Sequence, residues 1–355
     1  MQLGFGPSTM LVSVIIPACF ADATIGPCVK SLLAQTYPYW EAVIVADDGC
    51  DYAVILAGLG IADRRLRFVS TGAVRSGCHN ARNVGLSAAR GEIIAQLDAD
   101  DAYDHRRLAA LVPLVAAHGA AVDKSAVVSG MDNSTLYIAP QWGSAGSQLS
   151  AEALLEIGVP LFPVVRRSFT APRLAGVEYA EDIVASLRLI EELGPLPVLP
   201  DALYQYRVAP GSLCHDENSG QRFEAAYSSY LARLRNGDGF GLVRTRAAAV
   251  RGFSRKRAVN RLFMDAQRRT PGLTFQHFMA RYHGSLSRAF GAAARPRAVL
   301  RGPPPARITS AGLFRRRLRL VKYSALASAS LRFVGPQRRT RCLASNDRGR
   351  VRIPG

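Results

Sequence analysis

The chain has 355 residues, of which 48% are hydrophobic and 20% are charged, and it contains no internal repeat. This composition excludes a disordered or repeat protein and provides a core for one large or two ordinary domains. No apolar run reaches the roughly 20 residues that a membrane-spanning helix needs. The N-terminus also lacks the basic start and long apolar core of a signal peptide.

The formal net charge of +18 is divided unevenly along the chain. From Tyr230 onward there are 29 Lys and Arg against three Asp, a balance of +26. The first 229 residues hold the other 16 basic and 24 acidic residues, a balance of −8. An acidic front joined to a basic rear predicts a cation-requiring site in the front and contact of the rear with an anionic surface.

The cysteine spacing indicates the redox environment. It favours free thiols in a reducing cytoplasm over a zinc site, because CxxC pairs are absent. We therefore expect a cytoplasmic protein. The six cysteines are Cys19, Cys28, Cys50, Cys78, Cys214 and Cys342.

Strand-like and helix-like segments alternate through the first third of the chain. Apolar β-branched runs predict the strands, and apolar residues at helical spacing predict the helices between them. This alternation is typical of a parallel sheet with helices on its faces. In chain order we expect strands at 11–18, 40–49, 66–70 and 92–101, and helices at 25–36, 80–91 and 104–119, the last capped by Asp104 and interrupted or kinked near Pro113.

Acidic side chains follow two of these strands at their carboxyl ends. Asp47 and Asp48 end the second strand, and Asp98, Asp100 and Asp101 end the fourth. Ligands of parallel sheets bind at these ends, yet the sequence has neither a GxGxxG nor a GxxxxGK[ST] phosphate loop. Mg²⁺ and Mn²⁺ favour carboxylates together with substrate phosphate oxygens. The Asp cluster therefore predicts a divalent cation that carries a nucleotide diphosphate.

Three stretches in this order resemble the N-terminal half of the family 2 glycosyltransferases: "VSVIIPA", "SLLAQTYPYWEAVIVADDG" and "GCHNARNVGLSAARGEIIAQLDADD". A thinner likeness continues through "YAEDIVASLRLI" and "LYQYRVAPGS". The overall pattern is similar to bacterial enzymes that build exopolysaccharide repeat units of the succinoglycan type. The resemblance implies an α/β GT-A fold, a Rossmann-like mixed, mostly parallel sheet flanked by helices. To this fold the sequence adds a basic, mainly helical C-terminal extension.

The resemblance also implies a nucleotide-sugar site. Pro17 would line the base pocket, and Asp48 would accept a hydrogen bond from the base. Arg82 matches a donor-site arginine, whose fork suits phosphate or a neighbouring carboxylate. Asp98 would face the ribose or the metal, and Asp100 the metal and the diphosphate.

Asp182, in "AEDI", matches the catalytic base of the family; the alternative is an ordinary acid in the first turn of a helix. These positions together imply a metal-dependent, inverting glycosyl transfer with Mg²⁺ or Mn²⁺ as cofactor. The cation would neutralise the departing diphosphate while Asp182 takes the proton of the acceptor hydroxyl. The implied donor is a nucleotide-sugar, with a UDP-hexose favoured. The acceptor would be a glycan or a lipid-linked sugar in cell-surface polysaccharide synthesis.

Some positions depart from the family pattern. Cys19 stands where an aromatic residue is usual and is followed by Phe20, which could replace that aromatic against the base. Cys50 stands for the usual Ser and His105 for a common Pro. These departures bear on the identity of the nucleotide base in the donor. They leave the positions of the metal ligands and of the catalytic base intact.

Two other classes of protein compete with this reading. A phosphatase of the haloacid dehalogenase type also places DxD after a buried strand, but has Thr or Val where this chain has Ala102. A nucleic-acid-binding protein would use the basic stretches "SRKRAVNRLF" and "LFRRRLRLVKY" to grip phosphates. The acidic front opposes such binding and no motif for it accompanies these stretches, so we expect no nucleic-acid partner.

The charge division and the motifs predict three regions. Residues 1–229 would form the glycosyltransferase domain, 230–300 a basic helical extension, and 301–355 a linker, a basic amphipathic segment and a disordered tail after Gly335. Trp142 is a candidate platform for a sugar ring or, equally, a core residue. The amphipathic segment 312–334 predicts peripheral contact with the anionic inner face of the cell membrane, with a solvated helix or disordered tail as the alternative.

Overall fold

The computed structural model describes residues 9–130, 132–140, 146–174, 179–208, 218–276, 278, 279 and 281, all within one compact unit that spans residues 1–286. Trp142, the segment 312–334 and the tail after Gly335 lie outside the described residues, and the expectations for them stay predictions. Within the described ranges, no helix is both long enough and apolar enough to cross a membrane.

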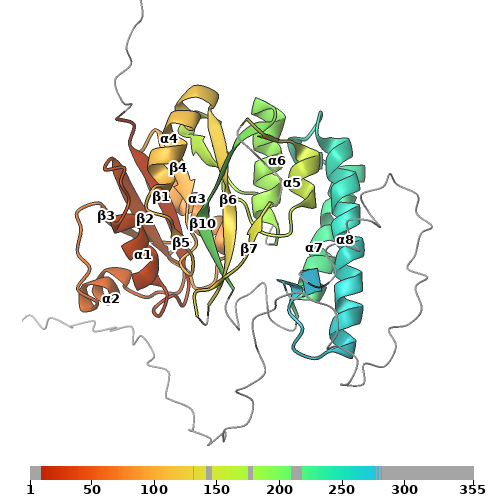
Figure 1. The fold of residues 1–355 in the computed structure, drawn as a ribbon, viewed down its shortest axis with the longest axis horizontal. Helices are drawn as coiled ribbons and strands as arrows, with labels where there is room; N and C mark the ends of the chain where they lie inside the picture. Colours follow the sequence, from red (N-terminus) through yellow and green to blue (C-terminus); the bar gives the residue numbers. More distant parts are fainter. Residues whose placement is uncertain are drawn as a thin grey trace, which may run out of the picture. The chain divides into compact units, whose positions relative to one another are not determined.

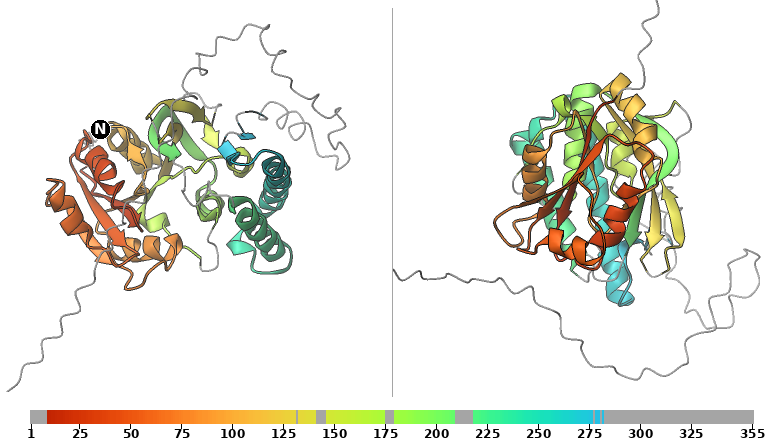
Figure 2. Two further views of the ribbon diagram at one scale, coloured as in Figure 1. Left: turned by 90° about the horizontal axis from the view of Figure 1, so that it is seen from below. Right: turned by 90° about the vertical axis from the view of Figure 1, so that its left-hand side faces the viewer.

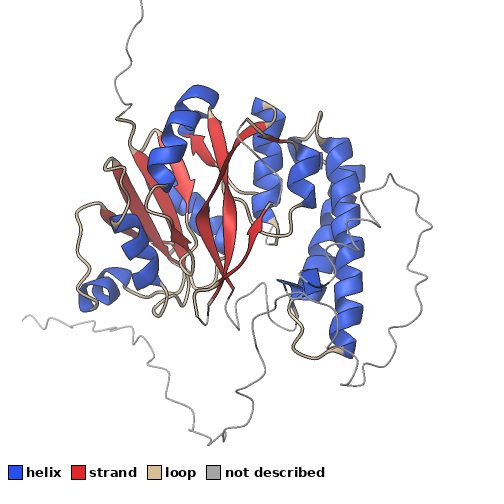
Figure 3. Cartoon of the chain, viewed as in Figure 1, coloured by secondary structure: helices blue, strands red, loops and turns tan. Residues whose placement is uncertain are grey.

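One mixed sheet organises this unit (Figure 1 and Figure 3). Six of its strands, the first four along the chain together with the sixth and the tenth, run in one direction; the other described strands run antiparallel to them. This confirms the predicted α/β class with a mixed, mostly parallel sheet. The spatial order is β3 (Leu66–Ser70), β2 (Trp40–Ala46), β1 (Val12–Ala18), β4 (Ile93–Gln96), β9 (Val164–Arg166), β6 (Ala120–Ser129), β10 (Leu196–Val208) and β5 (Ala102–Tyr103), with β7 (Thr135–Ala139) beside β6 and β8 (Gln148–Leu149) beside β10.

Helices cover both faces of the sheet because its central strands are apolar on both sides. In β1, Val14 and Ile16 pack into a core with α1 (Ile25–Leu33), α2 (Tyr52–Gly58) and α4 (Arg107–His118). Ile15, between them, points to the opposite face and packs in a second core against α3 (Cys78–Ala88). Successive side chains of a strand point to opposite faces, so a strand buried on both sides is apolar throughout.

Helix α3 lies very close to the sheet, and a glycine makes this approach possible. A Cβ atom added at Gly85 would lie 2.5 Å from Cγ2 of Ile15 and 3.0 Å from Cγ2 of Val45. Such distances are shorter than van der Waals contact, so the helix would have to move outward with any larger residue. The glycine of "ARNVGL" therefore sets the depth of the helix that carries Arg82.

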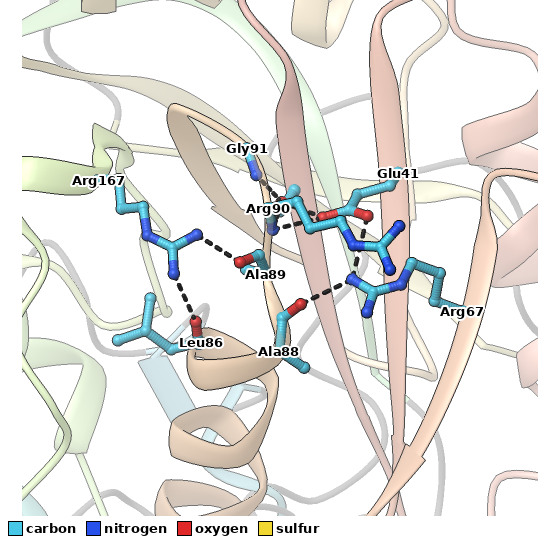
Figure 4. A network of polar contacts seen from close by, with 9 residues as sticks. Glu41, Arg67, Leu86, Ala88, Ala89, Arg90, Gly91 and Arg167 are labelled. Atoms are coloured by element: carbon cyan, nitrogen blue, oxygen red, sulfur yellow. Dashed lines mark hydrogen bonds and ion pairs between the residues drawn. The ribbon is translucent and has the colours of Figure 1, made fainter.

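The C-terminal end of α3 is held by a polar network (Figure 4). Arg67 of β3 donates to the carbonyl of Ala88 at 2.6 Å, and Arg167 donates to the carbonyl of Ala89. Both guanidinium groups satisfy carbonyls that a helix end leaves without an intrahelical partner. Glu41 of β2 accepts from Arg67 and from the backbone N–H of Arg90, which links this end of α3 to the sheet.

The second half of the unit adds a helical layer around β6 and β10. It consists of α5 (Ala151–Glu156), α6 (Glu181–Leu193), α7 (Ser219–Asn236) and α8 (Arg246–Arg269), with 3₁₀ turns at Arg167–Phe169 and Gly239–Gly241. Figure 2 shows α7 and α8 running side by side, and α8 also packs against α5. The predicted boundary between residues 229 and 230 falls inside α7. The division into domains stays a prediction.

Several basic side chains of α8 have acidic partners within the chain. Arg255 pairs with Glu156 of α5 at 2.8 Å, and Arg257 and Arg261 both pair with Glu224 of α7 at 2.7 Å. These ion pairs within the chain therefore neutralise part of the positive charge of the basic region and hold α8 against α5 and α7.

Helix α4 differs from its expected form at the N-terminal end. It begins at Arg107, not at Asp104, and it runs without interruption through Pro113. Asp104 accepts from the backbone N–H of Arg106 at 3.0 Å and so closes a turn that precedes the helix. The expected cap by Asp104 is wrong because its side chain satisfies this turn, and the N-cap residue is Arg106.

We expect Gly85→Ala to lower the free energy of unfolding by about 1–3 kcal/mol through overpacking against Ile15, although alanine is the better helix former by about 1 kcal/mol. Gly58→Ala is the matched control, because an added Cβ there meets no atom within 4 Å. Urea unfolding of both variants measures the difference. Equal stability of the two variants would contradict the close approach of α3.

Candidate active site

The residues expected to bind nucleotide lie at the carboxyl ends of β1, β2 and β4. Pro17 is the penultimate residue of β1, paired in register with Val45 of β2, and it is partly exposed. Asp48 is the second residue after β2, and Asp98 and Asp100 follow β4 within four residues. The structure therefore places all four at one edge of the sheet, where parallel sheets bind ligands.

Asp48 is held by three donors from the ends of β1 and β2. Its Oδ1 accepts from the backbone N–H of Cys50 at 2.9 Å. Its Oδ2 accepts from the backbone N–H of Phe20 at 2.5 Å and from the Tyr52 hydroxyl at 2.7 Å. A carboxylate has about four lone-pair positions, so the fixed Asp48 can accept one further hydrogen bond from a ligand.

Phe20 and Arg75 form an exposed pair beside Asp48. The Phe20 side chain is 56% exposed although it is large and apolar. The guanidinium of Arg75 lies 4.8 Å from the centre of its ring. Both residues have a positive φ, 54° and 57°, which costs backbone energy in residues other than glycine. An exposed aromatic face held in this way could stack on a planar ligand.

Asp47, the first acid of the pair, has a structural task. It is buried and accepts from the Thr71 hydroxyl at 2.8 Å, from the Ser76 hydroxyl at 2.5 Å and from the backbone N–H of Gly77 at 3.1 Å. These hydrogen bonds lower its pKa, against the effect of burial, which raises it. Because Gly77 is the N-cap of α3, Asp47 fixes the start of the helix that carries Arg82.

Arg82 is buried and joins two acidic side chains from distant parts of the chain. Its Nη2 donates to Oδ1 of Asp98 at 2.6 Å, and its Nη1 donates to Oε1 of Glu181. Its side chain is only 6% exposed. Burial lowers its pKa, but Cys78, Asp98 and Asp182 raise the pKa by more, so Arg82 is permanently charged.

Glu181 is the first residue of α6, and Asp182 is the second. The Arg82 bridge therefore fixes the start of α6, and with it Asp182, relative to the aspartates after β4. The structure brings Arg82, Asp98 and Asp182 into one site. The guanidinium of Arg82 was expected to suit either phosphate or a neighbouring carboxylate, and in the structure it binds carboxylates.

Asp100 and Asp101 lie in less favourable surroundings for a negative charge. Burial, and then repulsion from Asp98, raise the pKa of Asp100 to about 6. Asp101 is fully buried, accepts from the Tyr204 hydroxyl at 2.6 Å and from the backbone N–H of Arg207 at 2.8 Å, and also has a raised pKa because of burial. Asp101 thus ties the loop after β4 to β10.

Asp98 and Asp100 are the residues that fit a divalent cation. Within the described ranges, no three His, Cys, Asp or Glu side chains come together as metal ligands. Two carboxylates that repel one another at a sheet edge nevertheless suit Mg²⁺ or Mn²⁺, which often takes its remaining ligands from water and substrate phosphates. Because Asp98 uses Oδ1 to bind Arg82, the cation would be held by its Oδ2 and by Asp100.

Asp182 lies among three basic side chains from different segments. Burial raises the pKa of its carboxyl, and Arg82, Arg173 and Lys256 lower it, in this order of effect. Lys256 comes from α8 and donates to the carbonyl of Ile157 at 2.6 Å. Burial lowers the pKa of Lys256 to about 8. Asp182 is therefore a carboxylate whose affinity for a proton depends on its neighbours, as a general base requires.

The sequence interpretation missed several of these residues. Glu181 could have been found as the acid beside Asp182, and Asp101 as the last acid of the "DADD" run. Arg173 and Lys256 have no sequence pattern that marks them. The structural role of Asp47 and the ligand-binding role expected for Asp48 differ only because their side chains point in different directions at the end of the strand.

A mixed sheet with acidic residues at its carboxyl edge and a buried arginine behind them has the architecture of the GT-A fold. Solved structures agree with this fold. Residues 1–349 of S. aureus TarS superpose with a TM-score of 0.54 at 17% identity, covering 70% of this chain and 71% of that chain. The mannosyltransferase PcManGT of Pyrobaculum calidifontis, solved with GDP-Man and Mn²⁺, gives a TM-score of 0.51 at 17% identity over 78% of this chain and 80% of that chain.

Residues 13–163 match the model of the glycosyl transferase family 2. The succinoglycan biosynthesis protein ExoO of Rhizobium meliloti is 32% identical over 57% of this chain and 62% of its own length. The Escherichia coli enzyme WfgD, a UDP-Glc:alpha-D-GlcNAc-diphosphoundecaprenol beta-1,3-glucosyltransferase, is 37% identical over 28% of this chain and 38% of its own. This chain thus spans less than two thirds of the length of these relatives. Asp182 lies beyond the residues that match the family model.

Proposed function

We propose that the chain is an inverting, metal-dependent glycosyltransferase that moves a sugar from a nucleotide-diphosphate sugar, with a UDP-hexose favoured, to a hydroxyl of a glycan or lipid-linked acceptor. The observation that carries the proposal is the Asp98–Arg82–Glu181 bridge, since it links the candidate metal carboxylates to the helix that bears Asp182. The family match and the relatives named for polysaccharide biosynthesis support it.

The donor would bind along the carboxyl ends of β1, β2 and β4. Asp48 has one acceptor position left for a base N–H, and Pro17 lines the same edge. The exposed ring of Phe20 is available for stacking, in place of the aromatic residue that the family has at Cys19. The diphosphate would lie toward Asp98 and Asp100, where a bound Mg²⁺ or Mn²⁺ neutralises the charge that develops on the leaving group.

The acceptor would approach from the side of Asp182. Asp182 takes the proton from the attacking hydroxyl as the new bond forms at the anomeric carbon, and the bond to the diphosphate breaks on the opposite face. A single displacement inverts the configuration and needs no covalent sugar–enzyme intermediate. Arg82 holds Asp98 and α6 in place during this step, because both of its outer nitrogens are occupied by carboxylates.

We expect Asp100→Asn and Asp182→Asn to separate donor binding from transfer. Asp100→Asn should abolish Mn²⁺-dependent binding of UDP, because an amide is a much poorer ligand for a hard cation. It should not lower the melting temperature, since it removes the repulsion from Asp98. Asp182→Asn should bind UDP normally yet lose transfer by about 10²–10⁴-fold, the usual contribution of a general base.

Calorimetry with UDP and Mn²⁺, together with release of UDP from UDP-sugars, measures both effects. The control is Asp63→Asn, which alters a surface carboxylate paired with Arg65 and should change neither. Unchanged UDP binding by Asp100→Asn would show that Asp100 is not a metal ligand. Wild-type turnover by Asp182→Asn would show that Asp182 is not the general base.

The pH dependence of transfer should report the surroundings of Asp182. The base must be ionised, so activity falls as the pH drops through its raised pKa. Lys256→Met removes a positive charge that lowers this pKa, and the acidic limb of the kcat profile should therefore move to higher pH. Arg251→Met is the control on the same helix, because Arg251 pairs with the exposed Glu152. An acidic limb that stays in place, or moves to lower pH, contradicts an effect of Lys256 on the base.

We further propose that the basic region at the C-terminal end of the chain binds anionic lipid and keeps the enzyme at the cytoplasmic face of the cell membrane. The balance of +26 after Tyr230 supports this, since each engaged Lys or Arg contributes about 1 kcal/mol at an anionic surface. The protein should sediment with anionic liposomes at low salt and detach at high salt. Removal of residues 312–355 should weaken attachment and spare UDP binding. Equal binding to neutral liposomes would refute the proposal.

A further inference from the structure

Arg173 is a basic neighbour of Asp182 whose position none of the motifs explains, and its backbone is clamped to α3. The side-chain amide of Asn83 donates to the carbonyl of Arg173 at 3.1 Å, and the backbone N–H of Arg173 donates to Oδ1 of Asn83 at 2.6 Å. Asn83 follows Arg82 in the sequence. The preceding residue is held from α6, because Arg188 donates to the carbonyl of Pro172 at 3.1 Å. The segment that ends in Arg173 is therefore fixed between the two helices that supply Arg82 and Asp182.

The guanidinium of Arg173 is incompletely hydrogen-bonded. Its Nη1 is buried and has no hydrogen-bond partner among the described residues. The two carboxylates nearest to Arg82, those of Asp98 and Glu181, each already accept from Arg82. Burial, and then repulsion from Arg82, lower the pKa of Arg173 to about 10. A buried donor without a partner is costly to a folded protein, so a ligand is expected to supply what the chain does not.

The charge of that ligand follows from the neighbours. Arg82 disfavours the protonated form of Arg173, while Asp182, Cys78 and Asp98 favour it, so Arg173 lies within electrostatic reach of the candidate base and of one candidate metal carboxylate. In the proposed reaction this is where negative charge accumulates on the departing diphosphate. A guanidinium binds phosphate oxygens in a forked, charge-assisted geometry that a single amide or ammonium cannot provide.

We propose that Arg173 is a phosphate-binding residue of the active site, which donates through Nη1 to a phosphate oxygen of the bound substrate. The inference rests on the proposed glycosyltransferase function and adds to it a cationic ligand for the leaving group besides the metal. Two substrates could present such an oxygen: the diphosphate of the donor and the phosphate of a lipid-linked acceptor. The donor diphosphate is favoured, because it would lie beside Asp98, whose charge acts on Arg173.

The test compares a nucleoside diphosphate with its nucleoside in the full-length protein. UDP, GDP and dTDP are titrated in the presence of Mn²⁺, and the tightest of them is compared with the corresponding nucleoside. In Arg173→Gln the affinity for the diphosphate should fall by about 10- to 100-fold, the range of one hydrogen bond to a charged group. The affinity for the nucleoside should stay the same.

Stability separates a ligand-binding role from a structural one. Arg173→Gln should keep or raise the melting temperature of the ligand-free protein, because it removes a buried charge that repels Arg82. Arg166→Gln is the matched control. Arg166 is a half-buried arginine on β9 that donates to the carbonyl of Ala116 at 2.8 Å, so its replacement should lower the melting temperature and leave diphosphate affinity unchanged.

A second titration distinguishes the two sources of phosphate. Inorganic phosphate is added to protein saturated with the nucleoside diphosphate and Mn²⁺. Binding that is present in wild type and lost in Arg173→Gln, with unchanged diphosphate affinity, would assign Arg173 to the phosphate of an acceptor. If wild type binds a nucleoside diphosphate and Arg173→Gln binds both ligands as well as wild type does, the assignment of Arg173 is wrong. The proposed function is then not contradicted. If wild type binds no nucleoside diphosphate, the donor chemistry of the proposed function fails together with it.

Discussion

The buried guanidinium of Arg82 is the interaction on which the rest of the site depends. It binds Asp98 at the end of β4 and Glu181 at the start of α6, which lie 83 residues apart in the sequence. Removal of Arg82 would leave the buried charge of Glu181 uncompensated, at a cost of about 3–5 kcal/mol. A bridge of this kind contributes little net stability against an apolar substitute, so its value lies in position. It sets the candidate metal carboxylates and the candidate base at a fixed separation.

The fold serves that bridge by fixing α3 at three points. Asp47 holds the N-terminal end through Ser76 and Gly77, Gly85 lets the middle of the helix approach β1, and Arg67 holds the carbonyl of Ala88 at the C-terminal end. These contacts bind no ligand themselves. They explain why acids, glycines and arginines that take no part in chemistry surround the site, and why a change of packing at Gly85 would be felt at Arg82 one helical turn away.

The sequence predicted the sheet and the place of the candidate donor-binding carboxylates at its edge, because both depend on local order along the chain. Apolar strands followed by Asp48, or by Asp98 and Asp100, place those carboxylates at one edge in any parallel sheet. The partner of Arg82 could not be predicted, since Glu181 lies 99 residues further along and only the packing of α6 beside α3 brings it near. Lys256 was missed for the same reason: α8 reaches Asp182 through contacts with α5 that no local pattern specifies. The predicted N-cap of α4 was wrong for a local reason, because Asp104 accepts from the backbone N–H of Arg106 in the turn before the helix.

The charges of the site make its two ligands depend on one another. Without ligand, Asp98 repels Asp100 and Arg82 repels Arg173, so each sign of charge is crowded against its own kind. A cation alone would relieve the carboxylates and add to the field that already disfavours Arg173. A diphosphate alone would relieve Arg173 and meet the repulsion of Asp98 and Asp100. Only the two together neutralise both pairs, and binding of one should therefore strengthen binding of the other, as linkage requires. In the proposed transfer, the nucleoside diphosphate would still carry the charge that completes this balance after the sugar leaves, and the site would therefore also retain the product.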